Sequence, residues 1–327
     1  MRQVTFMIAD GVLKPSGLFG TIEVFEKANE FHLNKEEPPF YKVQLAGTNL
    51  KQKLLNGSFQ LNVTALEDIL KTDLIILPGF EIQDDFAVSK SKKALDWVVH
   101  QYHMGAEVAS LCTGAFLLAA TGLLEGKPCV THWKAEGDFR RLFPGLDLHT
   151  HKIITDQQGI YTAGGAVSSL NLALYIVEKY SGREAAIYCA KVLQIDIDRN
   201  SQSAFILFEG LKDHKDEIIL AVQDYIEKHI GDRLTINQLA VQSSMDRVNF
   251  SRRFKRATQL SPADYIQRVK VEAAKRQLES TQKQINEVMY DVGYIDIKAF
   301  RSTFKKVVGM TPGEYRNKFN KPESELK

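Results

Sequence analysis

Cysteines and long apolar segments are both scarce in this sequence. Only 3 of its 327 residues are cysteines, and none of them forms a CxxC pair beside a histidine cluster. Neither a zinc site nor a disulfide framework is therefore expected. No apolar segment approaches the roughly 18 residues that cross a membrane, and the first one is too short for a signal-peptide core. We expect a cytoplasmic protein with no metal, no cofactor and no membrane partner.

Charge is distributed unevenly along a chain that is long enough for two domains. Residues 1–210 contain 20 lysines and arginines against 24 acidic residues, whereas residues 211–321 contain 21 against 14. An acidic first part joined to a basic second part is a weak indication of nucleic-acid binding, because a solvated basic surface gives the same count.

The first part of the chain alternates short apolar segments with helical patterns. Apolar segments predict strands at 4–9, 41–47, 72–79, 106–111 and 127–133. Helical patterns lie between them at 20–31, 90–103 and 113–124. This alternation predicts an α/β fold with a mostly parallel sheet between layers of helices.

Strand patterns end after one more predicted helix at 182–195, and a polar, weakly periodic segment follows. This change in composition predicts the domain boundaries. We expect a first domain at 1–195, a linker at 196–213, an all-α domain at 214–321 and a tail at 322–327.

The second part of the chain contains an internal repeat. One copy begins at Ile236 and the other at Ile285. Phe250 and Phe254 recur 50 residues later as Phe300 and Phe304, so the second copy carries one extra turn residue. Each copy has the pattern of two short helices joined by a turn, which predicts two helix-turn-helix motifs.

In the first copy, Thr235 and Asp246 are placed to cap the two helices. The paired phenylalanines share one face of the second helix and are expected to be core. The opposite faces of the two second helices are expected to contact DNA through Arg247, Val248, Ser251, Arg252 and Lys255 in the first copy and Lys298, Arg301, Ser302 and Lys305 in the second. Because arginine can bind guanine and lysine can neutralise phosphate, we expect double-stranded DNA as a partner.

The segment from about 218 to 320, with "LTINQLA", "FSRRFKRATQLSPADYI" and "INEVMYDVGYIDIKAFRSTFKKVVGMTPGEYR", resembles the AraC-type DNA-binding domain. The resemblance implies that the two motifs enter successive major grooves. The chain departs from the family pattern at Ser302, where arginine is common, and at Gln259, where glycine is usual. The first departure favours Arg252 in the first copy for base reading.

The first part resembles the ThiJ/PfpI group of the class I glutamine amidotransferase-like superfamily, through "ILPGF", "ASLCTGAFLLAATGLLEGK", "THW", "TAGGAVSSLNLALYIVEKYSG" and "DRNSQSAF". The whole chain is similar to the GlxA-like regulators, which join that fold to an AraC-type domain. The resemblance implies a flavodoxin-like α/β domain followed by an all-α domain with two helix-turn-helix motifs.

Cys112 is expected at a strand-to-helix turn, where the helix N-terminus favours a thiolate or a bound anion. We expect a ligand pocket formed by Cys112, Thr113, Gly114, Gly79 and His132. Hydratase-like members of the family carry an aspartate where this chain has Ser16 and Gly17. The missing acid implies ligand binding without catalysis.

The sequence therefore predicts a sequence-specific transcriptional regulator, not an enzyme, whose first domain senses a small polar metabolite. Superfamily resemblance implies a homodimer, which would place two DNA-binding domains on one operator. Two alternatives stay open at this point. The first domain could retain amidase or hydratase chemistry at Cys112, or Cys112 could act as a thiol redox sensor.

Overall fold

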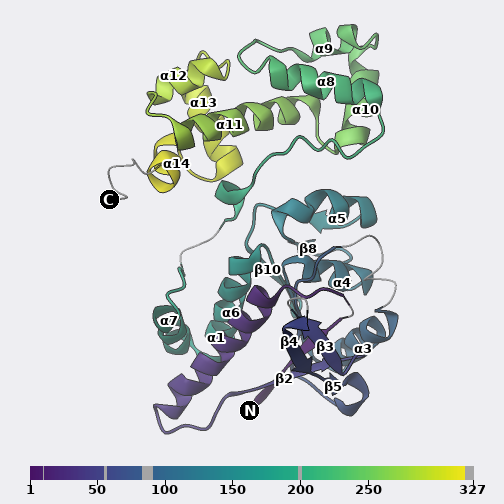
Figure 1. The fold of residues 1–327 in the computed structure, drawn as a ribbon, viewed down its shortest axis with the longest axis vertical. Coiled ribbons are helices and arrows are strands. Elements are labelled where there is room, and N and C mark those ends of the chain that lie inside the picture. Colours follow the sequence, from purple (N-terminus) through teal and green to yellow (C-terminus); the bar gives the residue numbers. More distant parts are fainter. Residues whose placement is uncertain (10, 55–56, 83–90, 198–200, 321–327) are drawn as a thin grey trace. The chain divides into compact units, whose positions relative to one another are not determined.

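The protein is described from a computed structural model, which defines residues 1–9, 11–54, 57–82, 91–197 and 201–320. The chain divides into two compact units, residues 1–202 and 203–327 (Figure 1). Three residues of the predicted linker, 198–200, lie outside the described residues, as do residue 321 and the predicted tail at 322–327. None of the described helices is both long and apolar enough to span a membrane.

The first unit is built on a seven-stranded sheet with the order β10-β11-β7-β6-β1-β2-β5. Its strands are β1 (Arg2–Ile8), β2 (Tyr41–Gly47), β5 (Thr64–Ala65), β6 (Leu74–Leu77), β7 (Glu107–Leu111), β10 (Ile154–Gln157) and β11 (Ile160–Ala163). All neighbouring pairs are parallel except β10 and β11 at one edge. The mostly parallel α/β fold predicted from the sequence is confirmed.

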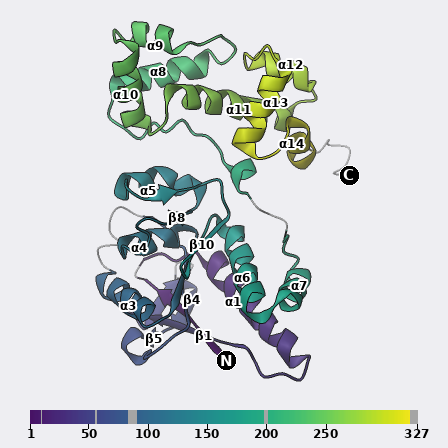
Figure 2. The same ribbon diagram turned by 180° about the vertical axis from the view of Figure 1, so that it is seen from behind.

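Helices cover both faces of this sheet, and Figures 1 and 2 show the two layers. One layer consists of α1 (Pro15–Leu33), α6 (Ala166–Ser181) and α7 (Arg183–Val192), and the other contains α3 (Lys92–His103) and α4 (Ala115–Ala120). Successive residues of a strand point to opposite faces. Phe6 therefore packs in the core cluster under α1 and α6, while Met7 packs in the cluster under α3 and α4.

Two sequence predictions in this unit are corrected. The strand predicted at 127–133 is only β8 (Pro128–Cys129), which pairs with β9 (Asp147–Leu148) in a separate two-stranded sheet. It is short because its partner β9 offers only two residues for pairing, and a 3-10 turn (Trp133–Ala135) and α5 (Glu136–Leu142) follow. The helix predicted at 113–124 ends at Ala120, and Gly122 adopts a φ of 79°, a left-handed value that helix continuation does not allow. A hairpin of β3 (Lys51–Leu54) and β4 (Phe59–Asn62) completes the unit.

The second unit is helical, as predicted. It comprises α8 (Glu217–Lys228), α9 (Ile236–Gln242), α10 (Arg247–Thr258), α11 (Pro262–Ser280), α12 (Ile285–Asp291), α13 (Ile297–Val308) and α14 (Pro312–Phe319). The helix pairs α9–α10 and α12–α13 are the two helix-turn-helix motifs. The predicted caps are confirmed, because Thr235 accepts a hydrogen bond from Gln238 N and Asp246 accepts from Val248 N and Asn249 N.

Each motif has its own apolar core, and the two phenylalanines of each second helix are fully buried. The turns of the two motifs also match, since Ser244 and Gly293 have φ values of 54° and 71°. The extra residue of the second copy is Ile295, which lies just before the α13 cap and is 86% exposed.

Residues 203–212, which we call the strap, lie across both cores of the second unit. Ala204 belongs to the core cluster of the second motif, and the Phe208 ring lies 5.3 Å from the Tyr265 ring in the first. The Lys275 ammonium donates to Ile206 O at 2.5 Å, and Gln223 Nε2 donates to Gly210 O at 2.6 Å. Part of the predicted linker therefore packs on helices of the second unit, while the predicted domain bounds stay predictions.

Candidate functional site

The outward face of α10 carries the residues that the sequence singles out in the first copy. Arg247, Arg252 and Lys255 are exposed, and Val248 is 74% exposed near the helix N-terminus. Ser251 is half-buried, and its hydroxyl donates to Arg247 O at 2.8 Å. The face therefore offers cations and one apolar side chain at positions that a DNA groove could reach.

A chain of side-chain hydrogen bonds runs along this exposed face. Asn249 Nδ2 donates to Asp246 Oδ2, and Arg252 donates from its guanidinium to Asn249 Oδ1 at 2.9 Å. Hydrogen bonds from Asn249 hold the pKa of Asp246 below its usual value. Because one N–H of Arg252 is already bonded, its guanidinium is oriented with other donors still available.

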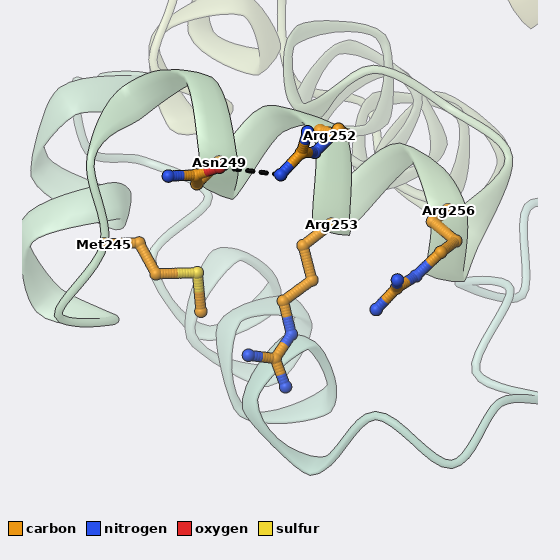
Figure 3. A pocket seen from close by; sticks show the side chains of 5 residues that line it. All are labelled: Met245, Asn249, Arg252, Arg253 and Arg256. Atoms are coloured by element: carbon orange, nitrogen blue, oxygen red, sulfur yellow. Dashed lines mark hydrogen bonds between the residues drawn. The ribbon is translucent and has the colours of Figure 1, made fainter.

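Beside this face lies an open hollow lined by Met245, Asn249, Arg252, Arg253 and Arg256 (Figure 3). Arg253 is not available for base contacts, because its guanidinium forms two hydrogen bonds, of 2.7 and 2.9 Å, with the Asp216 carboxylate at the start of α8. Arg256 forms no ion pair with any residue the structure describes. Asn249 and Arg256 are not among the residues predicted to contact DNA, although the spacing of "NFSRRFKR" puts both on the solvent side of α10.

The equivalent face of α13 is also exposed but is built differently. Lys298, Arg301, Ser302 and Lys305 are all exposed, and Lys306 lies beside them. Ala299 occupies the position that Asn249 has in the first copy, and Ser302 occupies that of Arg252. The second face therefore lacks the oriented arginine of the first.

In the first unit, Cys112 lies where the sequence places it, between β7 and α4. Its φ is 55°, a left-handed value that costs free energy for a residue with a side chain, and the thiol is 4% exposed. Gly114 is required by close packing, because a Cβ there would lie 2.2 Å from Leu77 O. A Cβ on Gly79 would lie 3.2 Å from Cys112 Cβ, so Cys112, Gly79 and Gly114 are brought together.

The Thr113 hydroxyl closes this turn from one side. It accepts a hydrogen bond from Phe80 N at 2.8 Å and donates to Phe80 O at 2.6 Å. The Thr113 hydroxyl is therefore occupied by the backbone that follows Gly79, and its part in the site is to hold the turn.

His132 is linked to the turn through its neighbour Thr131, whose hydroxyl donates to Cys112 O at 3.0 Å. His132 Nδ1 accepts from Lys134 N at 3.1 Å, so Nε2 carries the proton of the neutral ring. That side of the ring faces the start of α6, where a Cβ on Gly165 would lie 3.4 Å from Nε2. No direct hydrogen bond joins His132 to Cys112 within the described part of the chain.

Burial controls the protonation of both groups. It raises the pKa of the Cys112 thiol, against the opposing influence of Lys14 and hydrogen bonds from Thr113. It lowers the pKa of His132, in the same direction as Lys14 and Lys134. At neutral pH the site therefore holds a protonated thiol and a neutral imidazole.

Sequence reasoning missed two residues that complete this region. Lys14 donates its backbone N–H to Gly79 O at 2.9 Å and forms no ion pair with a described residue. Gln202 donates to Thr131 O and Lys152 O, both at 3.1 Å, and accepts from Gly165 N at 3.2 Å. Gln202 belongs to "DRNSQSAF", one of the segments that carry the family resemblance, but its hydrogen bonds to distant backbone groups could not be predicted from that segment.

No carboxylate stands beside the Cys112 thiol among the groups that shift its pKa. Gly17 lies buried on α1, where a Cβ would be 3.4 Å from Ser169 Oγ. The Ser169 hydroxyl is buried and has no hydrogen-bond partner among the residues the structure describes. Neither Ser16 nor Gly17 therefore brings a carboxylate to this turn.

Comparison with known proteins agrees with these two units. The DJ-1/PfpI family matches residues 2–179, and a helix-turn-helix domain matches residues 239–318. A solved structure of an AraC family transcriptional regulator from Pseudomonas putida covers 59% of this chain and 100% of its own, with a TM-score of 0.51 and 15% identity. At that identity the likeness concerns the fold alone.

Two curated relatives come from Pseudomonas aeruginosa. The HTH-type transcriptional regulator GbdR is 23% identical over 247 residues, which are 74% of this chain and 65% of that protein. The HTH-type transcriptional regulator CdhR is 23% identical over 306 residues, which are 92% of this chain and 87% of that protein. The similarity to CdhR thus extends over both units.

Proposed function

Because this chain belongs to the DJ-1/PfpI family and also carries a helix-turn-helix domain, we propose that it is a transcriptional regulator that binds specific double-stranded DNA. In this proposal α10 and α13 enter successive major grooves, and the first unit binds a small polar metabolite near Cys112. Such a regulator would act in the cytoplasm, beside the DNA.

The observation that carries the DNA-binding proposal is the pair of matching exposed faces. In both motifs the phenylalanine face of the second helix is fully buried, while the opposite face presents lysine and arginine side chains to solvent. A helix with this division is what a major groove accepts, because the cations meet phosphates and base edges while the apolar face stays in the core.

The direct test is a selection of DNA sequences by the full-length protein from a random duplex pool. The proposal expects enrichment of one motif, with an affinity that falls steeply as salt rises because bound phosphates release counterions. Failure to enrich any sequence, or to bind fragments from the region upstream of its own gene, would remove the regulator proposal.

For the effector we propose a small polar molecule that carries a carboxylate or a similar anion. Support comes from the neighbourhood of Cys112, Thr113, Gly114, Gly79 and His132. The backbone N–H of Lys14 donates to Gly79 O, and its ammonium has no counter-ion among the described residues. Lys14 therefore adds a cation at the edge of this site. A cation and neutral donors together favour an anionic ligand.

We propose that the molecule is bound there without being consumed. A nucleophilic thiol needs a nearby base or a lowered pKa, whereas burial raises the pKa of Cys112 and Gly17 brings no carboxylate. Steady-state turnover of amides or isonitriles that disappears in Cys112→Ser would instead support an enzyme.

We also propose that the protein forms a homodimer, because two DNA-binding domains on one operator increase the number of phosphate contacts. Light scattering at micromolar concentration tests this directly, and a clean monomer would contradict it.

A further inference from the structure

Lys270 on α11 is a buried cation that forms no ion pair with any residue the structure describes. The residue is 7% exposed, and its ammonium donates to two backbone carbonyl oxygens, Asp232 O at 3.0 Å and Gly293 O at 3.4 Å. Burial lowers its pKa, against the opposing influence of the Asp232 carboxylate. Burying a charge costs free energy, so a buried lysine that mainly contacts carbonyl oxygens is expected to have a structural role.

The two carbonyl oxygens come from different halves of the second unit. Asp232 lies between α8 and α9, just before the first motif, whereas Gly293 is the turn residue of the second motif. The ammonium therefore bridges the segment that leads into the first helix-turn-helix motif and the turn of the second motif, in addition to the continuous helix α11 that connects the two motifs.

The two backbones also approach each other closely at this point. A Cβ on Gly293 would lie 2.5 Å from the Lys270 ammonium and 2.7 Å from Gly231 O, and the φ of Gly293 is 71°. A Cβ on Gly231 would lie 3.4 Å from Asp291 O. Next to these residues, Ile230 packs against both core clusters. We call Ile230, Gly231, Asp232, Lys270 and Gly293 the junction.

The junction is placed where a change would alter the separation of α10 and α13. Each motif has its own core, so each can keep its fold while pivoting about α11. Two helices can enter successive major grooves of one duplex only if their separation matches one helical turn, about 34–36 Å. One added base pair also rotates the second half-site by about 35° around the DNA axis.

We propose that Lys270 is a positioning residue that holds the two helix-turn-helix motifs at one separation and thereby sets the half-site spacing that the protein selects. This inference rests on the proposed DNA-binding function. It adds that specificity for spacing is determined at the junction, away from any base contact.

The test uses the full-length protein and the DNA motif that the wild type enriches. Affinity is measured for the selected site, for sites with one base pair inserted or deleted between the half-sites, and for each half-site alone. The tested variant is Lys270→Met, which keeps the length of the side chain without its charge. The matched control is Lys275→Met, since Lys275 is equally buried on α11 but bonds Glu272 and Ile206 O.

We expect the wild type to prefer the selected spacing by about tenfold or more, because the second motif binds as a tethered partner. In Lys270→Met this preference should fall to about threefold or less while each half-site affinity changes by less than about twofold. Lys275→Met should keep the wild-type preference. An unchanged preference in Lys270→Met, or an equal loss on half-sites and full sites, would overturn the inference.

A second measurement needs no DNA. Spin labels at Val241→Cys in the first motif and Lys306→Cys in the second report their separation, because both positions are exposed and the three native cysteines are buried. The distance distribution should broaden in Lys270→Met and stay narrow in Lys275→Met. A distribution as narrow as that of the wild type would contradict the inference.

If Lys270→Met does not fold, Gly293→Ala is tested in its place, because the added Cβ disturbs the same contact from the other side. A wild-type spacing preference in Gly293→Ala would also overturn the inference. If the wild type enriches no DNA sequence, the proposed function is wrong. The spin-label distances, which need no DNA, then decide whether Lys270 holds the two motifs at one separation.

Discussion

Cys112 and Gln259 both hold left-handed backbone conformations, with φ values of 55° and 60°, that glycine adopts at lower cost. Their contexts differ. Cys112 is buried in the turn before α4, whereas Gln259 is the exposed residue that ends α10. The equivalent residue after α13 is Gly309, with a φ of 83°, so the second motif has glycine where the first has the strained Gln259.

Gln259→Gly should therefore stabilise the second unit. Relief of the left-handed strain is worth about 1–2 kcal/mol, and the greater freedom of glycine in the unfolded chain removes about half of that gain. We expect the free energy of unfolding to rise by up to about 1 kcal/mol in urea titrations. Gly309→Gln is the control and should lower the free energy of unfolding. The argument would be refuted if neither variant differed in stability from the wild type.

The thiol of Cys112 should be unreactive in the folded protein at neutral pH. Burial raises its pKa, and it raises the pKa values of Cys129 and Cys189 to about 12 and about 11. Since the thiolate is the reactive form, labelling of the folded protein by a disulfide reagent should be at least about tenfold slower than labelling in urea at the same pH. Its rate should go on rising with pH after the rate of the unfolded protein has levelled off. Rapid labelling of Cys112 near pH 7 would revive the redox-sensor and enzyme alternatives.

At the scale of secondary-structure elements, α10 and α13 occupy equivalent places but present different chemistry. The Asp246, Asn249 and Arg252 side chains form a connected chain on α10, whereas α13 has Ala299 and Ser302 at the last two of these positions. We therefore expect α10 to contribute more base specificity, and α13 to contribute mainly phosphate contacts through Lys298, Lys305 and its other cations.

Arg252→Ala should cost about 1–3 kcal/mol on the selected DNA site and much less on random duplex. Ser302→Ala, at the equivalent position of α13, should change the affinity by less than about 0.5 kcal/mol. Fluorescence anisotropy with both duplexes measures these effects. A loss of the same size on selected and random DNA would mean that Arg252 contacts phosphate.

These elements also show what the sequence could predict. The repeat places Phe250 and Phe300 in equivalent cores, because helical periodicity and a fixed 50-residue interval are local signals. The strand predicted at 127–133 failed because an apolar segment does not reveal which partner strand it meets. Gln202 and Lys270 were missed for a related reason, since their hydrogen-bond partners lie 23 to 71 residues away in the chain.

For the whole molecule, regulation requires that the effector bind one functional state of the protein better than another. A 100-fold difference in affinity corresponds to about 2.7 kcal/mol of coupling between effector and DNA. The proposed effector site and the DNA-binding helices lie in separate units, so variants at the first should change the response and spare DNA binding itself.

Cys112→Ala and His132→Ala should each abolish the effector response while ligand-free DNA affinity stays within a few-fold of the wild type. Native mass spectrometry of the purified protein, or a thermal-shift screen of small carboxylates, would first identify the effector. DNA affinity is then measured with and without it. A normal response in Cys112→Ala would place the sensing site elsewhere in the first unit.

The strap determines where the second unit could be cut from this chain and joined to another domain. The cores of both helix-turn-helix motifs contact side chains that precede α8, Ala204 in the second motif and Phe208 in the first. The segment needed to fold the second unit is therefore longer than its helices. A recombination breakpoint between 209 and 216 would deliver a DNA-binding module with two unfilled cores to its new partner. Breakpoints at or before residue 202 would carry the module intact, and viable fusions should cluster there.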